Sequence, residues 1–212
     1  MTGIVYKSTG SWYHVKSKDG EFHKCRMKGK FRIEGIRSTN PIAVGDKVMF
    51  DLEKKGDEET GVIKKILDRD NFIVRKSVNL SKQIHIIASN IDQVFLLITI
   101  DNPPTFPAFI DRFLVSTRAY RIETILVFNK IDSYEIEQRA EVLYLKDIYE
   151  KIGYTCVEVS STENKNVDTI KELMTSKTSM FVGHSGVGKS TLVNAIEPTL
   201  NLKTKQISEQ HK

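Results

Sequence analysis

The sequence predicts two domains of different class, an all-β barrel in residues 1–70 and a doubly wound α/β domain from residue 91 onward. Short strand-like segments separated by turn residues fill the first part. In the second part, apolar segments alternate with helical stretches, which is typical of a parallel sheet covered by helices. A hydrophobic content of 40% in 212 residues is enough to give both parts a packed core.

The barrel prediction depends on five strand-like segments, which read TGIVYKS, SWYHVKS, EFHKCRM, VGDKVMFDL and GVIKKIL. Turn signals such as Asp19-Gly20 and Gly45-Asp46 separate them, and no long helical periodicity interrupts them. Five short strands in this length favour a small barrel, with the oligonucleotide-binding (OB) type as the leading candidate. Residues 71–90 show no clear periodicity and are predicted to be a linker.

Positive charge is concentrated in the N-terminal part of the chain. Residues 1–80 contain 17 Lys and Arg against 11 Asp and Glu, whereas the remaining residues contain 15 against 16. Cations for phosphates and aromatic rings for bases are what a single-stranded RNA surface needs. The candidate RNA-binding residues lie on or just after one alternating strand: Lys24, Arg26, Lys28, Lys30, Arg32 and Arg37.

Two alternatives stay open for this region. The lysine-rich surface could simply be solvated. The aromatic residues Trp12, Tyr13 and Phe22 could be core residues of the barrel, and for each of them we favour this interpretation over base stacking.

The second domain is predicted from its alternation of buried strands and helices. Strands are expected at 93–100, 123–128, 154–160 and 179–183. Helices are expected after the prolines at 103, 104 and 107, over 134–151, over 167–173 and from 189. The inner stripe of the first helix is predicted to contain Phe106, Ile110, Phe113 and Thr117.

A phosphate-binding loop follows the last predicted strand. Residues 183–190 read GHSGVGKS and match the pattern G-x-x-x-x-G-K-[ST] at every fixed position. Glycines let backbone N–H groups turn toward phosphate oxygens, and the start of a helix adds a positive dipole end. Lys189 is the candidate catalytic cation, because it can reach the β- and γ-phosphates, and Ser190 is the candidate Mg²⁺ ligand. The predicted phosphate-binding set is Gly183, His184, Ser185, Gly186, Val187, Gly188, Lys189, Ser190 and Thr191.

A second motif, Asn129-Lys130-Ile131-Asp132, directly follows the strand ILVF. A carboxylate at Asp132 can accept hydrogen bonds from the ring N–H and the exocyclic amino group of guanine, a donor pair that adenine lacks. Asn129 can bond the other edge of the base, and the loop at Ser160 and Ser161 can offer a backbone N–H to its carbonyl. Alone, each of these segments could instead cap a helix. Beside a phosphate-binding loop in the same sheet, the combination predicts a guanine-nucleotide site.

The order of the two motifs is unusual. In Ras-like GTPases the phosphate-binding loop precedes NKxD, whereas here Asn129 precedes Gly183 by 54 residues. A doubly wound sheet can still bring both to one crevice, so this order indicates a circularly permuted GTPase domain.

These features together resemble the ribosome small-subunit-dependent GTPase A family (RsgA, also called YjeQ). The resemblance covers essentially the whole chain, and the phrases STGSWYHV, CRMKGKFR, NPIAVGDKV, IDRFLV and KSTLVNAI are similar too. It implies a monomeric bacterial GTPase that binds GTP, GDP and Mg²⁺. It also implies a role in late maturation of the small ribosomal subunit, stimulation of hydrolysis by that subunit, and contact of the barrel with ribosomal RNA. The site roles given above for residues 183–191, Asn129, Lys130, Asp132, Ser160 and Ser161 agree with the family pattern.

The family pattern continues beyond the position that Lys212 matches. Its members have a threonine-rich switch I, a D-x-P-G segment and a helical domain that holds Zn²⁺, none of which is in these residues. We therefore expect the sequence to be a piece of a longer chain. An RNA- or ribosome-binding module that binds nucleotide without hydrolysing it is the alternative function.

Cysteine usage and hydropathy bear on location. The two cysteines, Cys25 and Cys156, lack the spacing of a zinc site and argue against a disulfide framework. The sequence has no apolar run of membrane-spanning length, and its start, MTGIVYKSTG, lacks the features of a secretory leader. A cytoplasmic location is the expectation.

Overall fold

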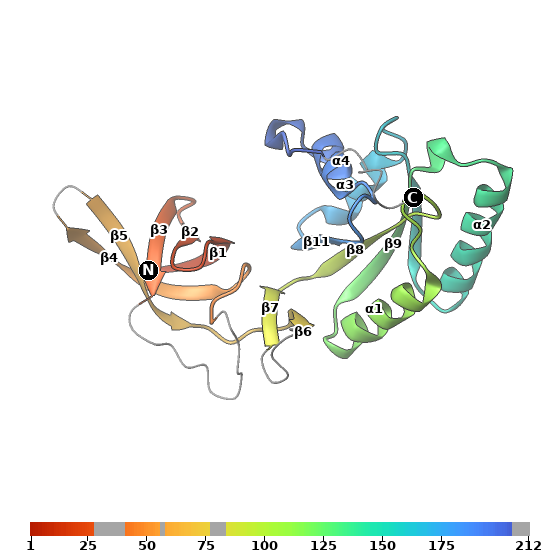
Figure 1. The fold of residues 1–212 in the computed structure, drawn as a ribbon. Coiled ribbons are helices and arrows are strands. Elements are labelled where there is room, and N and C mark those ends of the chain that lie inside the picture. The colour runs from red at the N-terminus through yellow and green to blue at the C-terminus, as the bar shows by residue number, and fades with distance from the viewer. Residues whose placement is uncertain (28–40, 56–57, 77–83, 205–212) are drawn as a thin grey trace. The chain divides into compact units, whose positions relative to one another are not determined.

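The computed structural model describes residues 1–27, 41–55, 58–76 and 84–204 (Figure 1). The chain divides into two compact units, Met1–Ile91 and Asp92–Lys212. No helix in the described residues is both long and apolar enough to cross a membrane.

Five strands of the first unit form a closed barrel in the order β1-β2-β3-β5-β4, which confirms the predicted OB-like barrel. They are β1 (Thr2–Ser8), β2 (Tyr13–Ser17), β3 (Phe22–Met27), β4 (Lys47–Lys55) and β5 (Glu58–Ile66). Strand β3 pairs in parallel with β5, and the other pairs are antiparallel. Alternate side chains point inward, so that Val5, Val15 and Cys25 are fully buried in one core.

Two parts of the predicted linker, residues 71–90, form strands in the described residues. Strands β6 (Phe72–Lys76) and β7 (Ile84–Ser89) form an antiparallel pair. Just before this segment, Arg69 forms a buried ion pair in which its Nε and Nη2 each donate to one oxygen of the Asp46 carboxylate at 2.6 Å. Ser89 donates to the same carboxylate at 2.6 Å. These contacts join residues more than 20 positions apart, which a scan for local periodicity does not detect.

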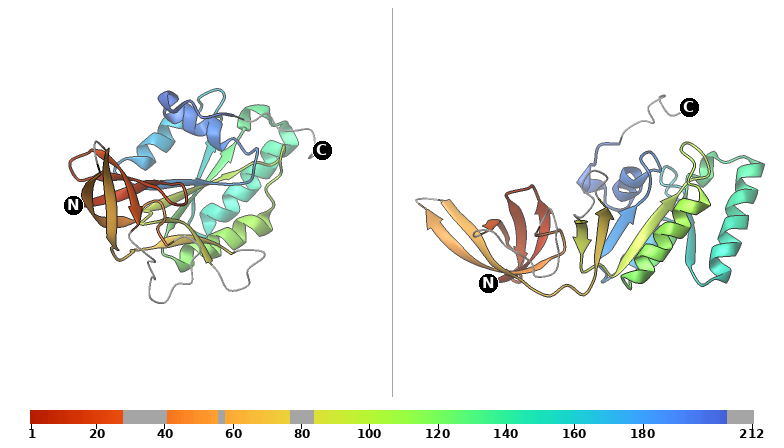
Figure 2. Two further views of the ribbon diagram at one scale, coloured as in Figure 1. Left: turned by 60° about the vertical axis from the view of Figure 1, so that its left-hand side comes forward. Right: turned by 60° about the horizontal axis from the view of Figure 1, so that its bottom comes forward.

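The second unit is a parallel sheet in the order β10-β9-β8-β11 with helices on both faces (Figure 2). In chain order its elements are β8 (Gln93–Ile98), α1 (Pro107–Ala119), β9 (Glu123–Asn129), α2 (Ile136–Lys151), β10 (Thr155–Val159), α3 (Val167–Met174), β11 (Ser179–Val182) and α4 (Lys189–Ile196). Two short 3₁₀ helices, Ile131–Ser133 and Pro198–Leu200, follow β9 and α4.

Alternate residues of the central strands enter two separate cores. Leu96 and Phe128 pack with α1 and α2, whereas Leu97 and Val127 pack with α3 and α4. This arrangement confirms the doubly wound α/β fold. In the predicted inner stripe of α1, Ile110 and Thr117 are buried, but Phe106 is 67% exposed and Leu114 is buried instead. Phe106 has an extended backbone (ψ 144°) because the helix begins only at Pro107.

Candidate functional site

The two sequence motifs meet at one edge of the sheet. Asn129 ends β9, Ser160 follows β10 and Gly183 follows β11. Because the strands are parallel, the three loops leave from the same, carboxyl edge of the sheet. The predicted phosphate and guanine contacts are therefore close in space although their motifs are far apart in the sequence.

The loop at 183–190 has the backbone form of an anion-binding nest. Gly183, Gly186 and Gly188 have φ values of 151°, 89° and 94°, which side chains with a Cβ rarely adopt. A Cβ on Gly183 would lie 2.7 Å from the carbonyl oxygen of Leu97, and one on Gly188 would collide with the Asn129 amide. Helix α4 begins at Lys189, directly after this turn. The loop thus has the glycines and the helix start that a phosphate cradle needs.

The Lys189 ammonium lies within the curve of the loop. Its Nζ donates to the carbonyl oxygens of Gly183 at 2.8 Å and His184 at 2.5 Å. Burial lowers the pKa of Lys189 from its ordinary value. Ser190 and Thr191 are half-buried in the first turn of α4. In the residues that the structure describes, no three His, Cys, Asp or Glu side chains gather as a metal site.

Asn129 connects the guanine motif to the phosphate loop. Its side chain is buried, and Nδ2 donates to the carbonyl oxygen of Val187 at 2.9 Å. Its Oδ1 accepts from the backbone N–H of Ser161 at 3.3 Å and from the Ser161 hydroxyl at 2.9 Å. One amide group therefore holds two loops, in addition to the base contact that the sequence predicts for it.

Asp132 is exposed at the same edge and is oriented by a hydroxyl network. Thr162 donates to its carboxylate at 3.1 Å, and the hydroxyls of Thr162 and Ser160 lie 3.1 Å apart. Burial works against ionisation, but hydrogen bonds from Ser160 and Thr162 and the charge of Lys130 outweigh it, so the pKa of Asp132 is lowered. The environment thus favours the ionised carboxylate, which is the form that the predicted guanine contact needs.

Lys130 does not point outward like an ordinary surface lysine. Its backbone is left-handed, with φ 67°, and its Nζ donates to the carbonyl oxygen of Asn102 at 2.5 Å. Burial lowers the pKa of Lys130, although the charges of Asp101 and Asp132 oppose the shift. The ammonium group is thereby tied to the segment that follows β8.

Three residues that the sequence did not predict support the site. Thr162 orients Asp132, and Tyr134 donates its hydroxyl to the carbonyl oxygen of Asn129 at 2.8 Å. Phe109 of α1 packs against His184 of the phosphate loop, with ring centroids 4.1 Å apart. The tyrosine and the phenylalanine give no motif signal, because their roles depend on contacts across the fold. Only Thr162 could have been suspected from the sequence, because it is a polar residue two positions after Ser160 in the same loop.

The barrel presents part of the predicted basic surface. Lys24 and Arg26 are exposed on β3, while Lys28, Lys30, Arg32 and Arg37 lie outside the described residues. The ammonium of Lys24 lies 4.4 Å from the centroid of the Trp12 ring. Arg26 pairs with Glu53 at 3.4 Å.

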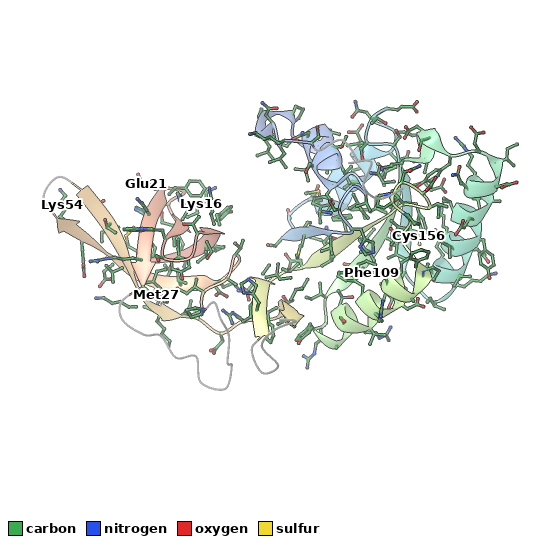
Figure 3. All side chains as sticks on the ribbon, viewed as in Figure 1. Lys16, Glu21, Met27, Lys54, Phe109 and Cys156 are labelled. Carbon is green, nitrogen blue, oxygen red and sulfur yellow. The ribbon has the colours of Figure 1, made fainter. Side chains whose placement is uncertain are left out.

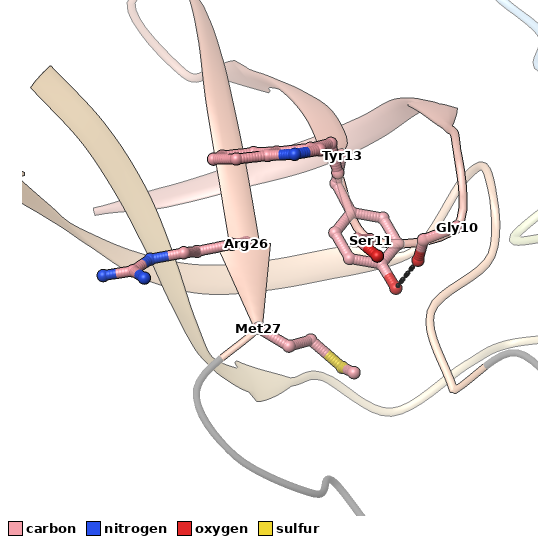
Figure 4. Close-up of a pocket in the computed structure, with 6 residues that line it drawn as sticks. Gly10, Ser11, Tyr13, Arg26 and Met27 are labelled. Carbon is pink, nitrogen blue, oxygen red and sulfur yellow. Dashed lines mark hydrogen bonds between the residues drawn. The ribbon is translucent and has the colours of Figure 1, made fainter. Parts of the chain in front are cut away.

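The aromatic residues of the barrel divide between core and surface. Tyr13 is 2% exposed, as the core interpretation predicts, and its hydroxyl donates to the carbonyl oxygen of Gly10. Phe22 is 58% exposed, so the prediction that it belongs to the core is wrong. A cavity of about 360 Å³ opens beside Tyr13 (Figure 4). Its lining residues are Gly10, Ser11, Trp12, Tyr13, Arg26 and Met27.

Comparison with known proteins agrees with this two-part organisation. A family model described as "RsgA GTPase" matches residues 66–212, and one described as "RsgA N-terminal domain" matches residues 2–63. Two curated relatives are named "Small ribosomal subunit biogenesis GTPase RsgA". The relative from Christiangramia forsetii is 65% identical over 211 residues, and that from Flavobacterium johnsoniae is 68% identical over 212. These matches cover 100% of this chain and 67% and 65% of the relatives, so the chain spans about two thirds of their length.

Solved structures show the same fold. The crystal structure of YjeQ from Thermotoga maritima is similar with a TM-score of 0.75 and 33% identity, over 96% of this chain and 67% of that one. YloQ, described as a circularly permuted GTPase, has a TM-score of 0.65 and 29% identity, over 93% of this chain and 64% of that one. With both family models matched in order and the permuted motifs meeting at one sheet edge, the chain belongs to the RsgA GTPase family.

Proposed function

We propose that this chain is the nucleotide-binding and RNA-binding part of an enzyme that hydrolyses GTP to GDP and phosphate during maturation of the small ribosomal subunit. The relatives' names support the process and the reaction class. The observation that carries the proposal is the Asn129 bridge, with 2.9 Å from its Nδ2 to the Val187 carbonyl oxygen. This bond joins the loops of the two motifs and so supports the assignment of both motifs to one nucleotide.

Phosphate binding is assigned to the loop and the start of α4. The backbone N–H groups of Ser185–Gly188 and the helix start would stabilise negative charge on the β- and γ-phosphates. Lys189, whose Nζ lies 2.8 Å from the Gly183 oxygen, would exchange loop carbonyls for phosphate oxygens. Ser190 and the phosphates would hold Mg²⁺, which neutralises charge that develops during phosphoryl transfer. Positioning and electrostatic stabilisation are thus the contributions of these residues.

Guanine selectivity is assigned to Asp132, with Asn129, Lys130, Ser160 and Ser161 around the base. The lowered pKa of Asp132 supports an ionised acceptor at neutral pH. An ionised carboxylate bonds both donors of guanine and would repel the acceptor at the corresponding ring position of adenine. Asp132→Ala should therefore remove the preference for GDP over ADP in calorimetric titration. Equal affinities of the unmutated protein for GDP and ADP would contradict this assignment.

The proposed partner is the small ribosomal subunit, contacted through its RNA by the barrel. Lys24 and Arg26 are the described members of the candidate RNA-binding set, and both are exposed. Monomeric state and cytoplasmic location are part of the proposal. Zinc is proposed only for the longer family pattern, since these residues contain two cysteines, one in each unit.

The decisive experiment measures GTP hydrolysis by the full-length protein with and without small subunits. Lys189→Ala should abolish the stimulated hydrolysis, because it removes the cation that reaches the γ-phosphate. A control variant, Lys203→Ala, changes an exposed lysine outside the loop and should leave turnover intact. Undiminished turnover by Lys189→Ala would refute the assigned role.

A second function, RNA binding without hydrolysis by these residues alone, is favoured by the charge of the barrel half. It is tested by comparing nucleotide turnover and small-subunit binding for residues 1–212. Binding to the subunit with no turnover at any subunit concentration would favour this alternative for the segment.

A further inference from the structure

Two exposed aromatic rings lie together on the outer face of the barrel. Tyr6 on β1 is 53% exposed and Phe22 on β3 is 58% exposed. Their ring centroids are 5.5 Å apart and the rings are nearly perpendicular, at 85°. Lys16 of β2 is labelled on the barrel in Figure 3, and its Nζ lies 5.7 Å from the Tyr6 centroid and 5.5 Å from the Phe22 centroid. We call these three side chains the Tyr6–Lys16–Phe22 cluster.

The strand pairing explains why three residues distant in sequence form this cluster. Lys16 stands directly opposite Phe22 in the β2–β3 ladder. Tyr6 lies on β1 where the register shifts between Val5 and Lys7, and β1 pairs with β2. Ile4 and Tyr6 are exposed and Val5 is buried, so Tyr6 keeps the regular outward alternation of the strand. The rings are therefore held by sheet geometry while remaining open to solvent.

The surroundings of the cluster are positively charged. Strands β1, β2 and β3 contain four basic residues and no acidic residue: Lys7, Lys16, Lys24 and Arg26. The other two barrel strands carry Asp51, Glu53, Glu58 and Glu59 among their lysines. The turn before β3 adds the exposed Asp19 and Glu21 at one end only. Charge on the strand face thus complements a phosphate backbone.

We propose that the Tyr6–Lys16–Phe22 cluster is a stacking site for unpaired bases of RNA. Aromatic rings bind bases of any identity through their faces, and neighbouring cations bind the phosphates between them. Perpendicular packing leaves ring surface free for such stacking. Neither ring belongs to the barrel core, so both faces of this pair are open to a ligand rather than committed to core packing. The inference rests on the proposed RNA binding by the barrel and assigns its base contacts to particular residues.

The test is binding of the full chain to a fluorescent single-stranded oligouridylate at low salt, measured by anisotropy. Phe22→Leu keeps an apolar side chain but removes the ring, and it should weaken binding about 5- to 100-fold, the effect of losing one stacked base. Tyr6→Ala should weaken binding similarly, whereas Phe22→Trp should retain it. Tyr144→Ala, which removes a tyrosine that is 67% exposed on α2, is the matched control and should change nothing. Binding to a duplex RNA of the same length should be insensitive to all four variants.

Three results would overturn the inference, and they have different meanings. If Lys24→Ala weakens binding but Phe22→Leu does not, the barrel binds RNA by charge alone and the proposed function stands without the stacking site. If the unmutated chain does not bind the oligonucleotide at low salt, RNA binding itself fails. If Phe22→Leu weakens binding to small subunits but not to RNA, the cluster contacts a protein instead.

Discussion

The Nδ2 atom of Asn129 donates to the carbonyl oxygen of Val187 at 2.9 Å, which joins two loops that are 58 residues apart in the sequence. Val187 is itself buried in the core beneath α4. The phosphate loop is thereby anchored on one side by packing and on the other by a buried amide.

Replacing Asn129 should affect stability and nucleotide binding together. Asn129→Ala leaves the Val187 oxygen and the Ser161 N–H without their partner, and an unpaired buried polar group costs about 1–3 kcal/mol. We expect a decrease of about that size in the free energy of unfolding, with weaker GDP binding. Urea unfolding and calorimetry measure the two effects. Tyr144→Ala, which removes a side chain that is 67% exposed on α2, should leave both unchanged, and unchanged stability and affinity in Asn129→Ala would show that the bridge is dispensable.

Thr162 should act on guanine binding through Asp132. Thr162→Val removes the donor at 3.1 Å while keeping the shape of the side chain. GDP affinity should fall about 2- to 10-fold, the worth of one ordinary hydrogen bond, and the pKa of Asp132 should rise because a donor to its charged form is lost. Carboxyl titration by NMR reports the second effect. Thr162→Ser should restore both quantities, and if it does not, packing rather than the hydroxyl explains the loss.

The contact between Phe109 and His184 should stabilise the phosphate loop. Their ring centroids are 4.1 Å apart, and an aromatic pair contributes about 0.5–1.5 kcal/mol beyond area burial. Phe109→Ala should therefore weaken GDP and GTP binding equally, by about 2- to 10-fold. Phe106→Ala at the start of the same helix removes a ring that is 67% exposed and serves as control. If nucleotide affinity falls in Phe106→Ala but not in Phe109→Ala, the helix terminus and not the ring contact affects the loop.

Breaking the buried ion pair of Asp46 and Arg69 should destabilise the first unit. The side chains of Asp46 and Arg69 are 0% and 7% exposed, and breaking such a pair leaves an uncompensated charge. Asp46→Asn should lower the free energy of unfolding by about 3–5 kcal/mol. Trp12, the single tryptophan of the chain, reports barrel unfolding by fluorescence. Asp70→Asn, at an exposed pair with Lys47, should hardly change the midpoint of barrel unfolding. Equal effects of the two variants would show that burial does not decide the cost of breaking the pair.

Both cysteines should be unreactive in the folded protein. Burial raises the pKa of Cys25 to about 11 and that of Cys156 to about 12, so neither thiol forms the reactive thiolate at neutral pH. Both pKa values lie above the ordinary value of 9.0, so folding favours the protonated thiols. Their contribution to the free energy of unfolding is complete below pH 9.0 and is lost as the pH rises through the folded-state pKa values. Iodoacetamide should label the two thiols only after denaturation. Labelling of the native protein at neutral pH would contradict the assignment.

The sequence alone determined the fold class, the barrel strands, the alternation of the second domain and the positions of both nucleotide motifs. Each of these is a local property: strands alternate with period two, the phosphate loop is eight consecutive residues, and Asn129 to Asp132 follow one strand. Such patterns can be recognised in the sequence because the physical cause of each element lies within the same few residues.

The tertiary structure decided which side chains support those motifs. The Asn129–Val187 bond and the contact of Phe109 with His184 each join residues that are far apart in the sequence. The pairing of β6 with β7 and the exposure of Phe22 likewise depend on how strands meet in the folded chain. The sequence around a phenylalanine on a strand looks the same whether its side chain is covered by another element or is left exposed. What covers it depends on sheet register and on the packing of other elements, and these are settled only when the chain folds.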